Sequence, residues 1–129
     1  MAAQRLHQAF RALSFTLVMI LGFSSASVLA HAHLKQQSPE AEATLTKAPS
    51  EIALKFSEGI ELKFSKIKLS GADNSAVETG TLLLDANDNT RIIAPLNGDL
   101  PPGKYNVNWN VVSIDGHKTK GNYSFTVKP

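Results

Sequence analysis

Two histidines, His31 and His33, stand one residue apart where an apolar N-terminal run gives way to a polar chain. Another histidine, His117, comes far downstream, and Asp115 precedes it by two residues. Imidazole nitrogens and carboxylate oxygens are ligands for divalent transition metals. A single histidine is more often a surface residue than a ligand, so metal binding here depends on whether these residues converge.

Asp115 and His117 have the spacing of residues that share one side of an extended segment. In such a segment the side chains of positions i and i+2 project together, so an oxygen and a nitrogen can reach one point. The alternative is that Asp115 and Gly116 form a hairpin turn that His117 merely follows. The local sequence does not separate these two interpretations.

The N-terminal segment has the features of a secretory signal peptide. Arg5 and Arg11 form a basic region, and the stretch 12–23 is apolar except for two hydroxyl residues. Small residues follow, and the apolar run is shorter than the roughly 20 residues that a membrane-spanning helix needs. We therefore expect a signal peptide over residues 1–32, a folded domain over residues 33–129 and no membrane span in the mature chain.

Two cleavage points satisfy the small-x-small rule, one after Ala32 and one after Ala30. The first leaves His33 as the new N-terminus and the second leaves His31. A terminal histidine offers both its imidazole and its α-amine, whose pKa near 8 lets a metal displace the proton. Each cut therefore creates a bidentate nitrogen chelate.

The first cut predicts a site that combines the His33 chelate with a nitrogen of His117 and an oxygen of Asp115. Three nitrogens and one oxygen in a tetragonal arrangement favour Cu(II), with Ni(II) next. The second cut predicts a different site, because a His-Ala-His terminus can wrap Cu(II) with backbone nitrogens and needs neither Asp115 nor His117. We favour the first.

Composition excludes several classes of function. The chain has 13 basic and 11 acidic residues, and the two arginines of the signal peptide account for the difference, so no basic excess remains to bind nucleic acid. There is no cysteine, and both methionines, Met1 and Met19, leave with the signal. Without a thiol nucleophile, a Ser-His-Asp order or paired carboxylates, we do not expect an enzyme.

Short alternating segments bounded by Gly, Pro, Asn or Asp predict an all-β domain. Apolar residues alternate along four segments, at 51–60, 64–71, 104–113 and 122–129, and a short strand at 90–96 is stopped by Pro95. Turn formers cluster at 70–76, 85–89 and 97–103. We expect about seven strands in a Greek-key β-sandwich or barrel, immunoglobulin-like in kind. Trp109 alternates with two valines, which favours a place in the core over a ligand-stacking role.

Several ordered motifs resemble the CopC family of periplasmic copper-binding proteins, most closely its YobA-type members. They are the exported N-terminal histidine with Ser-Pro shortly after it, the segment FSEGIE, and the pattern W-x-V-V-S-x-D-x-H followed by G-x-Y-x-F. The likeness runs from about His33 to Val127.

The resemblance implies a cupredoxin-like Greek-key sandwich in the periplasm that binds one Cu(II) through His33, Asp115 and His117. His31 would leave with the signal, and Glu58 would orient a ligand from outside the coordination sphere. The resemblance also implies copper buffering, or transfer to a CopD-like inner-membrane protein. Some members carry a methionine-rich Cu(I) site, which a mature chain without methionine cannot form.

Two other functions remain possible on the sequence. One is an oxidative enzyme of the lytic polysaccharide monooxygenase type, which also uses an N-terminal histidine on a β-sandwich. The small size of the domain and the anionic oxygen of Asp115 argue against it. The other is a metal-free structural sandwich, which leaves the set of His33, Asp115 and His117 unexplained.

Overall fold

Nine β-strands and one short 3₁₀ helix make up residues 32–129, the part of the chain that this computed structural model describes. They are β1 (Leu34–Ser38), β2 (Thr44–Leu45), β3 (Glu51–Phe56), η1 (Leu62–Phe64), β4 (Lys66–Gly71), β5 (Ala76–Val77), β6 (Leu83–Asp85), β7 (Asp88–Pro95), β8 (Gly103–Val112) and β9 (Lys118–Val127). Of the expected signal peptide, residues 1–32, only Ala32 lies within the described residues, so His31 lies outside them. Within that described range, no helix has the length and apolar character needed to span a membrane.

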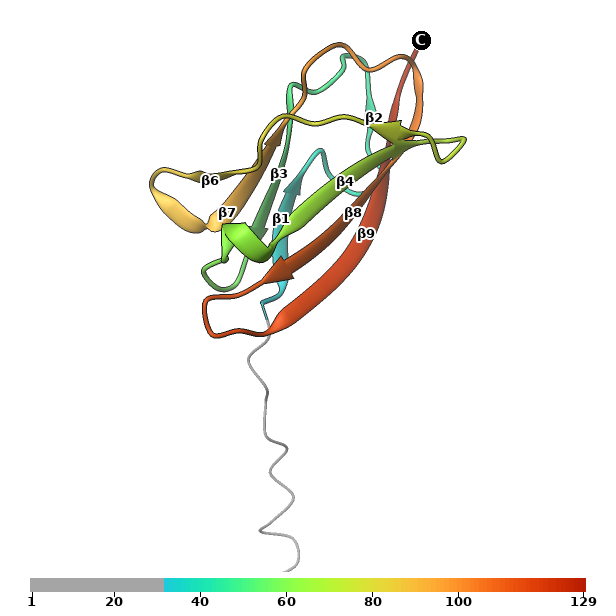
Figure 1. Cartoon of the computed structure of the whole chain (residues 1–129). Coiled ribbons are helices and arrows are strands. Elements are labelled where there is room, and N and C mark those ends of the chain that lie inside the picture. Colours follow the sequence, from blue (N-terminus) through green and yellow to red (C-terminus); the bar gives the residue numbers. More distant parts are fainter. Residues whose placement is uncertain (1–31) are drawn as a thin grey trace, which may run out of the picture. The chain divides into compact units, whose positions relative to one another are not determined.

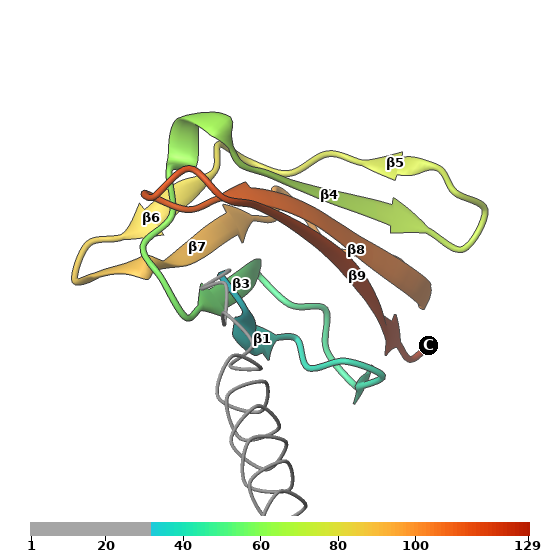
Figure 2. The same ribbon diagram turned by 90° about the horizontal axis from the view of Figure 1, so that it is seen from below.

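The strands form two sheets that face each other (Figures 1 and 2). One sheet has the order β1-β3-β7-β6, and the other has the order β2-β9-β8-β4-β5. All pairs are antiparallel except the short β2–β9 pair. The expected all-β sandwich is confirmed, and the strands beyond the expected number include β2 and β5, which have two residues each and are too short to alternate visibly.

Strand alternation places one face of each sheet in a common core, as the sequence predicts. On β8, Tyr105, Val107, Trp109 and Val111 are buried, whereas the asparagines between them point outward. The buried residues of β4 alternate in the same way, and the core side chains of β3 and β9 are Ile52, Leu54, Phe56, Tyr123, Phe125 and Val127. The core therefore lies between the sheets.

Trp109 is a core residue that ties the two sheets together. Its ring meets Phe56 of β3 edge-on, with centroids 5.2 Å apart and the ring planes at 74°. On the other side it lies against the backbone of its β9 partner, Gly121. A Cβ added to Gly121 would lie 2.8 Å from Cε2 of Trp109 and closer still to Cζ2. Only glycine leaves room for this ring, which fixes β9 beside β8.

We expect Gly121→Ala to destabilise the domain because the new methyl group must displace a buried ring from a packed core. The free energy of unfolding, measured by urea denaturation, should fall by about 1–3 kcal/mol. Gly98→Ala is the matched control, since an added Cβ there meets nothing within 4 Å. Equal stabilities of the two variants would contradict this packing.

Candidate metal centre

The Asp115–His117 segment forms the tight turn between β8 and β9. The backbone N–H of Ser113 donates to the carbonyl of His117 at 2.9 Å, and the N–H of Gly116 donates to the carbonyl of Ser113 at 2.8 Å. Gly116 has a φ of +89°, a conformation that favours glycine. The Asp-Gly pair is thus a hairpin turn, as one of the two interpretations of the sequence expected.

The side chains of Asp115 and His117 nevertheless meet. Nδ1 of His117 lies 2.8 Å from Oδ2 of Asp115, and the hydroxyl of Ser113 donates to Oδ1. The hydroxyl of Ser113 and then the ring of His117 lower the pKa of Asp115 to about 2. The turn, rather than strand alternation, brings the two side chains together, and their role as metal ligands stays a prediction.

This pair has the spacing of two adjacent ligands on one metal ion. Nitrogen and oxygen ligands of first-row divalent ions bind at about 2.0 Å, and two such ligands at a right angle are about 2.8 Å apart. The separation between His117 Nδ1 and Asp115 Oδ2 is 2.8 Å. Both side chains are about two-fifths exposed, so an ion from solvent can reach them.

His33 lies at the start of β1 and is held by Ser57. Its backbone nitrogen donates to Oγ of Ser57 at 2.8 Å, and the N–H of Ser57 donates back to the carbonyl of His33 at 2.8 Å. The imidazole belongs to an exposed residue, whereas the preceding Ala32 is fully buried. The nitrogen of His33 therefore has a defined place.

Residues 57–61, the segment between β3 and η1, join His33 to the β8–β9 turn. We call this segment the 57–61 loop. Gly59 accepts a hydrogen bond from the N–H of Ile114 at 3.0 Å, and the N–H of Glu61 donates to the carbonyl of Val112 at 2.8 Å. Figure 1 shows the start of β1, this loop and the β8–β9 turn at the same end of the sandwich.

Residues 32–129 contain no group of three or more His, Asp or Glu side chains placed to hold a metal ion. The structure brings Asp115 together with His117 and does not add His33 to them. In the unprocessed chain the nitrogen of His33 is a peptide amide bonded to Ala32, so it cannot act as an amine. Glu58 is half-buried in the 57–61 loop, and its orienting role remains a prediction.

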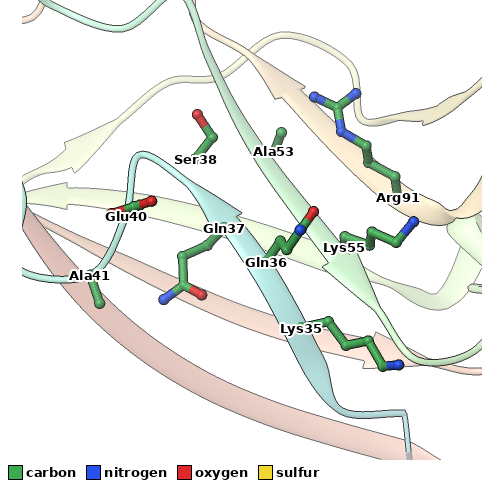
Figure 3. A pocket seen from close by; sticks show the side chains of 9 residues that line it. All are labelled: Lys35, Gln36, Gln37, Ser38, Glu40, Ala41, Ala53, Lys55 and Arg91. Carbon is green, nitrogen blue, oxygen red and sulfur yellow. The ribbon is translucent and has the colours of Figure 1, made fainter.

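A hollow of about 570 Å³ lies on the outer face of the β1-β3-β7-β6 sheet, and no histidine lines it (Figure 3). Figure 3 shows Lys55 and Arg91 side by side on β3 and β7. Lys55 pairs with Asp88 at 2.9 Å, and Arg91 pairs with Asp85 at 3.0 Å. The lining of the hollow includes three basic side chains and one carboxylate, that of Glu40, so the hollow is not a candidate metal centre.

Ser57 and Ser113 hold His33 and Asp115 by hydrogen bonds and were not among the site residues expected from the sequence. Ser113 forms part of a Ser-x-Asp-x-His pattern, so its spacing from Asp115 was a usable signal. Ser57 is separated from His33 by the whole of β1 and β3, and no local pattern links the two.

The sequence is similar to known proteins over most of its length. Residues 34–128 match the model of the CopC domain family. Protein YobA of Escherichia coli K12 is 45% identical over 119 residues, which cover 92% of this chain and 96% of that protein.

Two solved structures share the fold. CopC from Methylosinus trichosporium OB3b superposes with a TM-score of 0.72 at 30% identity, covering 77% of this chain and 95% of that one. PcoC, described as a methionine-rich copper resistance protein from Escherichia coli, has a TM-score of 0.69 at 38% identity and covers 77% of this chain and all of that one. By its motifs, its fold and these similarities, the chain belongs to the CopC domain family.

Proposed function

We propose that this protein binds copper in the service of copper homeostasis and resistance, as a periplasmic protein that holds one Cu(II) per chain. Relatives with this fold are named for copper resistance. The observation that carries the proposal is the 2.8 Å pair of Asp115 and His117, tied through the 57–61 loop to the segment that begins at His33.

Processing after Ala32 supplies the remaining donors. The cut converts the His33 nitrogen, already held by Oγ of Ser57, from an amide into an α-amine. It also removes the fully buried Ala32, which occupies the space directly before that nitrogen. The amine and ring of His33 would then join His117 and Asp115. Cleavage after Ala30 would keep Ala32 in place, and the mass of the exported protein distinguishes the two.

The donor set determines the oxidation state that we propose. Nitrogen and carboxylate ligands suit Cu(II), whereas Cu(I) prefers thiolates and thioethers. The chain has no cysteine, and its two methionines lie within the proposed signal peptide. Unlike a methionine-rich relative, the mature protein would therefore carry copper in one oxidation state, and would buffer it or pass it to a CopD-like inner-membrane partner.

A binding protein fits the pair better than an oxidative enzyme. An oxygen-activating copper keeps a coordination position open, and the ionised carboxylate of Asp115, with a pKa of about 2, would occupy such a position. An anionic oxygen also stabilises the higher oxidation state. Incubation of the copper-loaded protein with polysaccharide and a reductant tests the alternative: release of oxidised fragments would overturn our assignment.

Removing either member of the pair should weaken Cu(II) binding. For His117→Ala and Asp115→Asn we expect a loss of affinity larger than the roughly 10–100-fold that follows loss of an outer-sphere contact. Titration against a competing chelator measures it. Asp73→Asn is the matched control, because Asp73 is also an exposed turn carboxylate whose pKa is lowered by a serine, Ser75. An equal loss in the control variant would contradict the site.

An extra residue before His33 should have a similar effect, because it turns the α-amine back into an amide. We expect a loss of Cu(II) affinity of at least about tenfold, measured by the same titration. The same residue appended after Pro129 is the control and should change nothing. If the N-terminally extended protein binds copper as tightly as the processed one, the amine is not a ligand.

Acidification should release copper in a range set by nitrogen ligands. Amines and imidazoles must lose their protons to bind a metal, and in model peptides they titrate between about 6.5 and 8. Asp115, with its pKa lowered to about 2, stays ionised far below that range. The apparent affinity should therefore fall steadily between about pH 7 and pH 5. A constant affinity down to the titration of Asp115 would contradict the nitrogen-rich set.

A further inference from the structure

The outer face of the β2-β9-β8-β4-β5 sheet carries a shallow hollow of about 560 Å³ between β4 and β9, with β8 as its floor. We call it the lysine groove. Lys66 and Lys120 are both register partners of Asn110, one on each side of it. Lys68 and Lys118 also line the groove, from β4 and β9.

The charge of this groove is not compensated. Within residues 32–129, no carboxylate lines it and none of its four lysines belongs to an ion pair. The opposite sheet differs, since Lys55 and Arg91 are both paired with carboxylates there. Because like charges repel, this group of cations gives the fold no electrostatic stabilisation.

The lysines on the two sides of β8 are close enough for their charges to interact. Neighbouring strands are about 4.8 Å apart, so Lys66 and Lys120, on either side of β8, have backbones about 10 Å apart. This is close to the Debye length of about 8–10 Å at physiological salt. A charge of opposite sign placed between the two lysines would remove the repulsion and would face both of them at once.

The groove also offers apolar contact. Phe64, in η1, is 64% exposed and lines one end of the groove, together with the half-buried Val112. The ammonium of Lys63 lies 5.9 Å from the centre of the Phe64 ring. Exposed aromatic side chains surrounded by charged residues are typical of protein interfaces. In such an interface the apolar side chain contributes affinity and the charges contribute specificity.

We propose that the lysine groove binds an acidic segment of a partner protein in which carboxylates flank one large apolar side chain. The groove is bounded by lysines on two sides, which suits an extended segment better than a flat membrane surface. Lys118 directly follows His117, so a bound partner would lie beside the candidate metal centre. The proposal goes beyond metal binding and requires no bound metal.

A short synthetic peptide with glutamates on both sides of one phenylalanine is the probe, and the same peptide with glutamines in place of glutamates is its control. The protein is ¹⁵N-labelled and used in its metal-free form. Addition of the acidic peptide should shift the backbone amide signals of Lys66, Asn110 and Lys120 in its NMR spectrum. The glutamine peptide should not. Raising the ionic strength from about 0.05 M to about 0.5 M should abolish the shifts.

Variants locate the binding. The double variant Lys66→Gln and Lys120→Gln should weaken peptide binding by about fivefold to tenfold, as expected for the loss of two exposed charge pairs. The control double variant, Lys47→Gln and Lys128→Gln, has the same net charge but changes lysines at the opposite end of β9, and its affinity should stay within about twofold. The groove variant should also have an equal or higher melting temperature, because it loses repulsion.

Three results would overturn the proposal. The first is that the acidic peptide binds no better than its glutamine control. The second is an equal loss of affinity in both double variants, which would show an effect of net charge alone. The third is that the protein binds vesicles of phosphatidylglycerol and phosphatidylcholine through the groove lysines and does not bind the peptide, which would identify a membrane surface as the occupant.

Discussion

The geometry of the candidate metal centre depends on the hydrogen bonds of the 57–61 loop. Backbone donors and acceptors that leave a sheet have to find partners, and this loop finds them in two distant segments. Ser57 exchanges two hydrogen bonds with His33, while Gly59 accepts one from Ile114. One short segment thus fixes the start of the domain relative to the turn that holds Asp115 and His117.

The core makes this arrangement rigid. Trp109 fills the space between Phe56, the last residue of β3, and Gly121, near the start of β9. The 57–61 loop begins directly after Phe56, and the β8–β9 turn precedes β9. Packing in the interior therefore sets the position of both segments that the loop connects, and a methyl group added in the core would disturb the site above it.

The fold could be predicted from the sequence because its signals are local. Period-two alternation marked Tyr105, Val107, Trp109 and Val111 as inward-facing, and the Asp-Gly pair marked the turn. The strands β2 and β5 could not be predicted, since two residues carry no period.

The site was predictable only in part. Asp115 and His117 are neighbours in sequence, and their spacing identified them, although a turn rather than a strand unites them. The link from His33 to Ser57 depends on the pairing of β1 with β3, which only the folded chain reveals. The proposed processing of the N-terminus is a covalent event, and it would decide whether the His33 nitrogen is an amide or an amine.

The outer faces of the two sheets differ in whether their basic side chains form ion pairs. On the outer face of the β1-β3-β7-β6 sheet, Lys55 and Arg91 both form ion pairs with carboxylates. The outer face of the other sheet leaves the lysines of β4 and β9 unbalanced. Net charge alone, which is near zero for residues 33–129, conceals this separation. Only the strand register shows which charges share a face.

Pulsed electron paramagnetic resonance of the processed, Cu(II)-loaded protein tests the central claim most directly. With ¹⁵N introduced only into histidine, the hyperfine couplings report how many imidazoles bind the ion and whether the α-amine of a histidine binds as well. Our account predicts two coordinated imidazoles, from His33 and His117, and one amine nitrogen. Coupling to a single imidazole, or to backbone nitrogens of the N-terminal segment alone, would contradict it.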